Sequence, residues 1–546
     1  MQAERNLAAR RRSEGNFTRQ STVHACWFTR KIPQCTGSRS THLVATGRHA
    51  PGAFVQQGAE VHFRFLGRLF RIGFAWVRLE TAERLADRAA DPSDIVFKQR
   101  RAPSAGFSGE APVLLQHGHM DHILEELRWR GLIHQTTDEE SLARLLSEKM
   151  CTIYVGFDPT SDSLHVGNLV ALMVLRRFQR AGHRPIAVVG GATGMIGDPS
   201  GKSEERNLLS PEAIAANIAG IEPQLCRFLD FRCGANSALL VNNYDWMGKF
   251  GYLEFLRDVG KHFPVNVMLT KESVRNRLQR GDAGISYTEF SYMLLQAYDF
   301  VYLYDHYDCQ IQAGGSDQWG NITAGIDLAR RLRGVQLYGI TCPLLTRADG
   351  SKMGKTESGA VWLSPRKTSP YQFYQYWINV DDADVAKCLK YLTDLGRSEI
   401  EQLLDEHQRN PERRVAQRRL AAELTQLVHG AEGLQIAERA TQIFFGQQIG
   451  QLTSEQIDAI FADVPSSRLP RCRLDAPGLP VIDALLAAGL VKSKSEARRL
   501  ISQGGAYVNN RVVASQEAVL GPEDLLAGSA IVLRVGKKNY ALLRLV

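Results

Sequence analysis

The stretch GFDPTSDSLHVGN, residues 156–168, gathers polar side chains where a buried strand is predicted to end and a helix to begin. The apolar run CTIYV directly precedes it, and His165 and Asn168 fall in the first turn of the predicted helix. Thr160 lies just after an Asp-Pro turn. The stretch contains no cysteine and no second histidine at metal-ligand spacing, so it offers polar groups without an obvious nucleophile or metal to activate.

A glycine-rich segment, RPIAVVGGATGMIGDPSGKS (residues 184–203), comes close to two nucleotide-binding motifs without matching either. Gly191, Gly194 and Gly197 follow a predicted strand, but their GxxGxxG spacing differs from the GxGxxG of dinucleotide-binding folds. GDPSGKS is one residue short of the P-loop spacing, and a phosphate nest of backbone N–H groups depends on that register. What remains is a glycine loop suited to anionic groups, carrying Asp198, Lys202 and Arg206.

Residues 287–300, YTEFSYMLLQAYDF, are predicted to form a helix with a polar face. Tyr292, Gln296 and Asp299 are spaced at i, i+4 and i+7 and therefore share that face. Buried polar groups need partners, so these side chains either satisfy one another in the core or line a pocket for an amine, an amide or a hydroxyl. After the strand-like run and double glycine of residues 309–315, Asp317 stands where α/β sheets hold a nucleotide ribose.

A glycine-flanked loop, LLTRADGSKMGKTES (residues 344–358), carries Lys352 and Lys355. Two lysines on a mobile loop can close on a polyphosphate as point charges. A solvated charged loop is the alternative interpretation of these residues alone.

The pattern between residues 150 and 350 predicts a parallel sheet, because short apolar runs alternate with amphipathic helices. We expect strands at CTIYVGF (151–157), RPIAVVGG (184–191) and LQAYDFVYLYD (295–305), and a helix at LVALMVLRRFQRAG (169–182). The fold class is therefore α/β: a Rossmann-like parallel-sheet domain at 119–345, an α-helical domain at 346–465, a linker at 466–479, and a small α+β domain at 480–546.

The first 118 residues differ from the rest of the chain. The net charge of the chain is +8, yet residues 1–118 hold 18 Lys/Arg against 9 Asp/Glu, so the remainder sums to −1 and gives no argument for nucleic-acid binding. The basic, aromatic stretch 63–80 is interpreted either as a targeting segment or as part of an upstream region that forms no domain, with Met120 as a plausible start. His117, His119 and His122 are expected to be a solvated helix start.

The nine cysteines are scattered without CxxC spacing, which predicts reduced thiols in a reducing compartment, the cytoplasm. The sequence has no run of about 18 apolar residues, so we expect no membrane-spanning helix.

Five ordered stretches give the chain a resemblance to class I aminoacyl-tRNA synthetases, most closely the bacterial-type tyrosyl-tRNA synthetases, over about residues 120–546. HVGN (165–168) stands at the family's HIGH signature and KMGKT (352–356) at its KMSKS signature; GFDPT, GGATGMIGDPSGK, GISYTEFSYMLLQAYDF and GGSDQWGNI also match in order. The resemblance implies attack of an amino-acid carboxylate on ATP, in which the protein supplies positioning and charge stabilisation. This explains the missing nucleophile.

The resemblance also implies roles for individual residues. Tyr154 and Asp299 would bind the phenol of tyrosine, Tyr292, Gln296 and Asp198 its α-amino group, and Gln318 would lie near its carboxylate. Catalytic roles would fall to Thr160, His165, Asn168, Lys352, Lys355 and Thr356. ATP binding would involve Gly156, Asp158, His165, Gly167, Lys202, Arg206, Asp317 and Lys355. Mg²⁺ is expected with ATP, without an assigned protein ligand. Asn168, Gly354 and Thr356 depart from the signatures but keep a side-chain donor and both lysines, and Val155 replaces a frequent Cys.

The last domain resembles an S4-type RNA-binding module. Ser493 and Glu496 form a possible capping box at its second helix. Lys492, Lys494, Arg498, Arg499 and Arg511 would face tRNA phosphates, unless they are simply a solvated helix face. The family also implies a homodimer.

Three other interpretations remain open. A tryptophanyl-tRNA synthetase shares the fold and both signatures, but Asp299 with Tyr154 favours a phenol over an indole, because an indole only donates. A non-catalytic RNA-binding relative is disfavoured by intact His165, Lys352, Lys355 and Asp317. A dinucleotide-dependent oxidoreductase is disfavoured by the glycine spacing.

Overall fold

The computed structural model describes residues 123–200, 208–279, 284–356 and 359–546. The basic extension, Met120, His117, His119 and His122, together with Lys202 and Arg206, lie outside the described residues. All described residues belong to one compact unit, Ser93–Val546.

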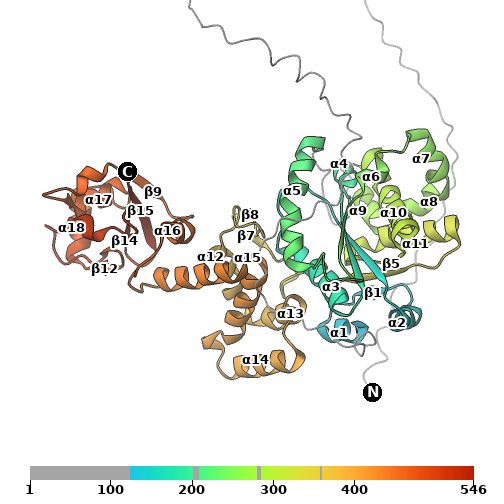
Figure 1. The fold of residues 1–546 in the computed structure, drawn as a ribbon, viewed down its shortest axis with the longest axis horizontal. Coiled ribbons are helices and arrows are strands. Elements are labelled where there is room, and N and C mark those ends of the chain that lie inside the picture. The colour runs from blue at the N-terminus through green and yellow to red at the C-terminus, as the bar shows by residue number, and fades with distance from the viewer. Residues whose placement is uncertain (1–122, 201–207, 280–283, 357–358) are drawn as a thin grey trace, which may run out of the picture. The chain divides into compact units, whose positions relative to one another are not determined.

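A mostly parallel sheet organises the first part of the described chain, with strands in the order β1-β6-β5-β2-β3-β4 (Figure 1). Neighbours from β6 to β4 pair in parallel, and the short β1 closes the edge antiparallel to β6. The central strands β2 and β3 are mainly apolar because both faces of the sheet are covered. The strands are β1 Gln135–Thr136, β2 Thr152–Phe157, β3 Arg184–Val189, β4 Leu239–Asn242, β5 Cys309–Gly315 and β6 Tyr338–Cys342.

Successive residues of β2 contribute to different cores, which shows how the helices are distributed over the two faces. Ile153 and Val155 pack in the core that includes α3 and α5, whereas Tyr154 packs in the core that includes α10 and α11. The chain order reverses between β2 and β5, and ligands of open α/β sheets bind at such a switch point beyond the carboxyl ends of the strands. The helices are α1 Ile123–Arg130, α2 Glu139–Glu148, α3 Leu169–Arg180, α4 Thr193–Ile196, α5 Pro211–Phe228, α6 Tyr244–Met247, α7 Tyr252–Asp258, α8 Val265–Thr270, α9 Glu272–Gln279, α10 Tyr287–Tyr307 and α11 Trp319–Arg333.

The expected strand at 295–305 is wrong: these residues continue α10 to Tyr307. Within the run, Ala297, Phe300 and Leu303 are buried at a spacing of three residues, which fits one face of a helix rather than the alternation of a strand. The expected strands at 151–157 and 184–191 and the helix at 169–182 are confirmed within a few residues.

A helical region follows the sheet, and its core is continuous with one face of it: Phe373, Trp377 and Leu389 belong to the same cluster as α3. The long α15 has non-helical backbone at Gly430. No helix in the described part of the chain is long and apolar enough to cross a membrane. The elements are β7 Lys355–Thr356, β8 Gly359–Ala360, α12 Pro370–Ile378, α13 Asp382–Leu392, α14 Arg397–Arg409, α15 Val415–Phe444 and α16 Ser454–Ile460.

The carboxyl-terminal region forms a second sheet in the order β12-β11-β14-β15-β9. β9, Ser466–Leu469, lies in the expected linker but pairs in parallel with β15. Ser493 caps α18 as expected, although the Glu496 carboxylate accepts from the Lys492 N–H rather than from Ser493. The elements are β10 Leu479–Pro480, α17 Val481–Ala487, α18 Lys494–Ser502, β11 Ala506–Val508, β12 Arg511–Val512, β13 Val519–Leu520, β14 Ala530–Val535 and β15 Asn539–Leu545. The predicted fold class, a parallel α/β domain with a helical and a small α+β part, is confirmed.

Candidate active site

A buried carboxylate and a buried phenol lie at the α10 side of the sheet. Asp299 of α10 is 3% exposed and Tyr154 of β2 is 2% exposed. The Asp299 carboxylate accepts from Asn243 Nδ2 at 3.0 Å and from Trp246 Nε1 at 2.7 Å. The Tyr154 hydroxyl is buried without a hydrogen-bond partner among the described residues. A buried hydroxyl without a partner is costly, so this geometry suits a ligand hydroxyl arriving between the two groups.

Burial raises the pKa of Asp299 to about 7, against the opposing effect of the hydrogen bonds from Asn243 and Trp246. Burial, together with the nearby Asp299 charge, also holds the pKa of Tyr154 well above its usual value. Asp299 therefore exchanges its proton near neutral pH, while Tyr154 stays a neutral donor and acceptor. Asn243 and Trp246 were missed in the sequence, where only the polar run NNYDW, at the end of β4, hints at them.

A second group of hydrogen-bonded polar side chains comes from α10, the glycine loop and the start of α11. Gln318 Nε2 donates to Asp198 Oδ2 at 2.7 Å, and Gln296 Nε2 donates to Gln318 Oε1 at 3.3 Å. Gln296 Oε1 is buried without a partner among the described residues. Asp198 and Gln296 thus present oxygens suited to an ammonium group, as the resemblance implied.

Tyr292 shares the predicted polar face of α10 with Gln296 and Asp299, but its hydrogen-bond partner is Asp158, directly after β2. Its hydroxyl donates to Asp158 Oδ2 at 3.0 Å, and Asp158 Oδ1 accepts from Thr193 Oγ1 at 2.8 Å. Thr193 Oγ1 in turn accepts from Asn243 Nδ2 at 3.0 Å. Asp158, expected at ATP, is therefore also part of a hydrogen-bonded chain that runs from Tyr292 through Thr193 and Asn243 to Asp299. Thr193 is a member of this chain that the sequence did not indicate.

The first signature folds into a tight reciprocal cap at the start of α3. His165 Nδ1 accepts from the Gly167 N–H at 3.0 Å, and Asn168 Oδ1 accepts from the His165 N–H at 3.0 Å. In the neutral ring the proton is therefore on Nε2. A Cβ on residue 167 would lie 2.7 Å from His165 Cε1, so glycine is required there. Asn168 Oδ1 thus holds the His165 backbone in this cap, and the expected donor role of Asn168 stays a prediction.

The second signature lies directly against the first. The Val166 N–H donates to Val361 O at 2.9 Å and the Leu363 N–H donates to Leu164 O at 2.8 Å, so the segment after the signature runs antiparallel along residues 164–166. The Trp362 ring meets the His165 ring edge-on at 6.1 Å. Lys352 and Lys355 are exposed, whereas Met353 and Gly354 are buried between them. Thr356 lies in β7.

The remaining predicted ATP residues lie at the carboxyl ends of the central strands. Gly156 is exposed near the end of β2, with no atom within 4 Å of a Cβ built there. Asp317 follows β5 at the start of the turn into α11, and Thr160 is exposed beyond β2.

The five predicted tRNA-contact residues are exposed. Lys494 pairs with Asp483 at 2.8 Å, so part of its charge is neutralised. The others present cations to solvent from α18, its preceding loop and β12; they are Lys492, Arg498, Arg499 and Arg511.

A parallel sheet with two contacting signature loops over its carboxyl edge defines a class I aminoacyl-tRNA synthetase. The family model "tRNA synthetases class I (W and Y)" matches residues 146–446, and "Tyrosine--tRNA ligase SYY-like C-terminal domain" matches residues 456–543. The chain therefore belongs to this family. Within it, a tyrosine--tRNA ligase of Rhodopirellula baltica is 61% identical over 423 residues, covering 78% of this chain and 96% of that protein.

Other relatives agree. A tyrosine--tRNA ligase of Bacillus caldotenax is 53% identical over 423 residues, covering 77% of this chain and 99% of that protein. A C-terminally truncated mitochondrial tyrosyl-tRNA synthetase of Aspergillus nidulans superposes with a TM-score of 0.54 at 33% identity, covering 59% of this chain and 94% of that one. The predicted membership of the bacterial-type tyrosine--tRNA ligase family is confirmed.

Proposed function

We propose that this protein is a tyrosine--tRNA ligase that works in two steps at one site. A carboxylate oxygen of L-tyrosine attacks the α-phosphorus of ATP, the bond from that phosphorus to the bridging oxygen breaks, and pyrophosphate leaves. A hydroxyl of the 3′-terminal ribose of tRNA(Tyr) then attacks the tyrosyl carbonyl carbon, and AMP leaves. The observation that carries this proposal is the buried Asp299 carboxylate together with the buried Tyr154 hydroxyl, which has no hydrogen-bond partner within the described ranges.

Substrate selection follows from that pair. The phenol of tyrosine donates to ionised Asp299 and accepts from Tyr154. An indole N–H can donate but cannot accept, so tryptophan would leave the Tyr154 hydroxyl unpaired. Phenylalanine would also leave that hydroxyl unpaired and would bring no donor to Asp299. At the other end, Asp198 and the free oxygen of Gln296 receive the α-ammonium group, and Gln318 and Tyr292 border it. The tyrosine carboxylate is thereby directed towards the switch point of the sheet.

Stabilisation of the departing pyrophosphate is assigned to both signatures. His165 and Thr160 are assigned as donors from the first loop, close to the positive end of α3. Lys352, Lys355 and Thr356 approach from the second loop, and Lys202 and Arg206 are assigned to the same phosphates. Gly156 and Gly167 are assigned to the nucleotide: no atom lies within 4 Å of a Cβ built on Gly156, whereas Gly167 makes room for the His165 ring. Asn168 holds the His165 backbone, and Asp317 receives the ribose.

Mg²⁺ is proposed to enter with ATP. Its preferred ligands are oxygens, and it is commonly held by substrate phosphates with one or two carboxylates rather than by a protein cage. The described residues contain no group of three or more His, Cys, Asp or Glu side chains placed to hold a metal ion. The proposed ion is therefore one that arrives on the triphosphate. The ion would neutralise charge on the β- and γ-phosphates.

The tRNA is proposed to contact the carboxyl-terminal region through Lys492, Lys494, Arg498, Arg499 and Arg511. Cations on one helix and a neighbouring strand suit phosphate contacts that position the RNA without specifying its sequence. We place the reaction in the cytoplasm, in keeping with the free cysteines of the described chain.

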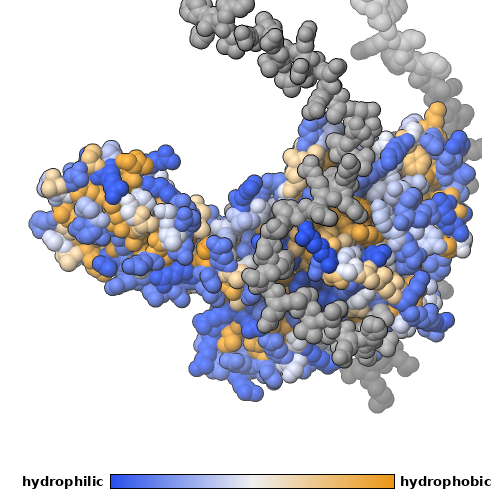
Figure 2. All heavy atoms as spheres, in the orientation of Figure 1, coloured by the Kyte–Doolittle hydropathy of each residue, from blue (hydrophilic) through white to orange (hydrophobic). Residues whose placement is uncertain are grey.

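A second copy of the chain is the proposed occupant of an exposed apolar surface on α7–α10. Leu253 is 78% exposed and Tyr252 is 65% exposed, and apolar side chains are visible over this region in Figure 2. Clustered apolar exposure of this kind marks protein interfaces. The other members are Val265, Val267, Leu269, Leu278 and Tyr287. Sedimentation should show a dimer that Leu253→Lys converts to monomer; a wild-type monomer would refute this part.

The two-step proposal is tested by single-turnover kinetics. Enzyme mixed with tyrosine and ATP should form a bound adenylate that transfers tyrosine when tRNA(Tyr) is added. His165→Ala should slow adenylate formation while leaving tyrosine binding unchanged. Adenylate formation at the wild-type rate in His165→Ala would contradict the role given to the first signature.

A further inference from the structure

A lysine outside both signatures holds the base of the second signature loop. Lys387, on α13, donates from Nζ to the Thr346 carbonyl and pairs with Asp384 Oδ1 at 2.9 Å. The Lys387 side chain is 27% exposed, whereas that of Asp384 is 2% exposed. The ammonium group is thus fixed by a buried carboxylate on one side and a loop carbonyl on the other.

The held carbonyl belongs to the hairpin that carries the signature. Thr346 is the antiparallel bridge partner of Lys352, and the Met353 N–H donates to Leu345 O at 2.9 Å. Cys388, the residue after Lys387, places its Sγ 3.8 Å from Met353 Sδ. One turn of α13 therefore contacts both arms of the hairpin, at Thr346 and at Met353, the residue after Lys352.

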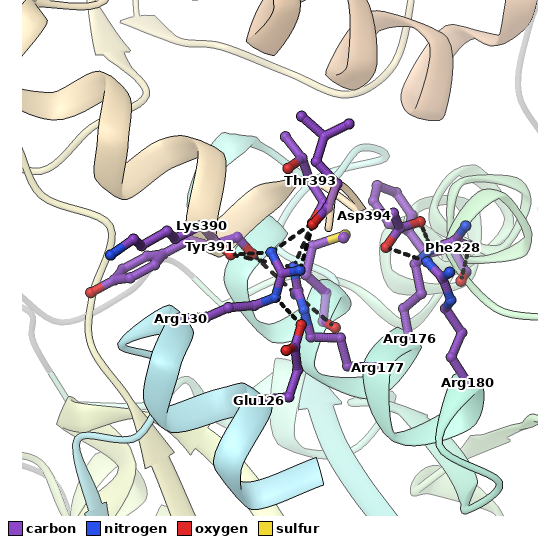
Figure 3. Close-up of polar contacts among 12 residues, drawn as sticks. Glu126, Arg130, Arg176, Arg177, Arg180, Phe228, Lys390, Tyr391, Thr393 and Asp394 are labelled. Atoms are coloured by element: carbon purple, nitrogen blue, oxygen red, sulfur yellow. Dashed lines mark hydrogen bonds and ion pairs between the residues drawn. The ribbon is translucent and has the colours of Figure 1, made fainter. Parts of the chain in front are cut away.

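α13 is itself fastened to the helix that starts at the first signature. Figure 3 shows arginines of α1 and α3 directed at the carbonyl end of α13. Arg177 of α3 donates to Tyr391 O at 3.1 Å and to Thr393 O at 2.7 Å, and Arg130 of α1 donates to Lys390 O at 2.9 Å. A guanidinium at a helix carboxyl end satisfies free carbonyls and complements the helix dipole.

These contacts form a continuous path between the two signatures. α3 begins after Asn168, its last turn holds α13 through Arg177, and α13 holds the hairpin of Lys352 through Lys387. We propose that Lys387 is a positioning residue for tyrosine activation: it fixes the position of the Lys352 hairpin relative to His165. In this role Lys387 acts through Thr346 and not by contact with tyrosine or ATP. This inference rests on the proposed function of the two signatures.

The expected consequence is a specific loss in the chemical step. Without the ammonium group the hairpin can shift against α13, and small misplacements of phosphate-binding groups reduce the rate strongly. Tyrosine binds on the α10 side of the sheet, away from this path, so its affinity should be unaffected. A merely structural role would instead lower the amount of active enzyme or alter tyrosine and ATP parameters together.

The test is steady-state ATP–pyrophosphate exchange with the full chain, together with equilibrium binding of tyrosine. Lys387→Met should lower kcat about tenfold while the Kd for tyrosine stays within about twofold of wild type. Lys387→Arg, which keeps a cation able to reach a carbonyl, should restore most of the rate. Arg397→Met is the control, because Arg397 forms an exposed intrahelical ion pair with Glu401 on the neighbouring helix α14, and it should leave kcat unchanged.

Loss of Lys387 also leaves the buried Asp384 carboxylate without this cation, which can destabilise the protein. The double variant Lys387→Met/Asp384→Asn removes that charge, and it should fold while retaining the low kcat. The proposal is overturned if the double variant has wild-type kcat, if Kd for tyrosine rises in parallel with the loss of rate, or if Arg397→Met loses as much.

Discussion

The contact between the two signatures can be tested at a single glycine. Gly354 has φ +83°, and a Cβ added there would lie 3.0 Å from Val166 Cβ, closer than ordinary van der Waals contact. Its backbone has little freedom to move away, because its N–H donates to the Tyr376 hydroxyl at 2.8 Å and its carbonyl accepts from the Val361 N–H at 2.8 Å. Gly354→Ala should therefore displace the segment between Lys352 and Lys355.

Gly350 provides a matched control in the same loop. It has φ +84°, but an added Cβ would meet no atom within 4 Å. Both alanines pay roughly 1–2 kcal/mol for a left-handed backbone. In Gly354→Ala, overpacking against Val166 adds a further destabilisation of typically about 1–3 kcal/mol. If about 1.4 kcal/mol of that difference appears in the activation barrier, the rates of the two variants differ about tenfold.

The assay is ATP–pyrophosphate exchange at saturating tyrosine and ATP, with thermal unfolding measured on the same samples. Gly354→Ala should have about one tenth of the kcat of Gly350→Ala, with similar tyrosine affinity. Equal kcat values for the two variants would refute the reasoning, because they would show that the Val166 contact does not set the position of the lysines.

Three further outcomes follow from the pocket and the basic surface. Asp299→Asn should lower kcat/KM for tyrosine about tenfold or more, since hydrogen bonds to charged groups contribute about 1.5–3 kcal/mol. The same substitution should change kcat/KM for phenylalanine much less. An equal loss for both amino acids would contradict the phenol contact. The burial-raised Asp299 pKa of about 7 means that tyrosine, which binds the ionised carboxylate, should lose affinity as pH falls through 7. Between pH 8 and 6 the Kd from equilibrium dialysis should rise about tenfold, and the dependence should vanish in Asp299→Asn; a flat wild-type profile would count against this assignment. Arg498→Gln should weaken tRNA binding and reduce its salt dependence without changing pyrophosphate exchange, and unchanged tRNA affinity would remove Arg498 from the interface.

Much of the fold could be predicted because its signals are local. The run CTIYVGF and the amphipathic helix after HVGN indicate β2 and α3 by periodicity alone. The error at 295–305 arose because a helix buried on several sides shows an apolar run that resembles a strand. β9 escaped prediction because a short edge strand gains its stability from pairing with β15, which lies far away in the sequence.

The candidate site was predictable where one element carries several of its residues. Gln296 and Asp299 share a face of α10, and residues 165–168 are contiguous. Asn243, Trp246 and Thr193 were not predicted, because they act through side chains from other elements and their types alone imply no chemistry. Lys387 belongs to the same category: its partner Thr346 is 41 residues away, and only the packing of α13 brings them together.

The most direct test of the account is amino-acid-dependent ATP–pyrophosphate exchange, measured with the full chain for each of the twenty amino acids. The Asp299 and Tyr154 pair predicts exchange with tyrosine and none above background with tryptophan or phenylalanine. Exchange driven by tryptophan, or by no amino acid, would contradict the assignment of the pocket.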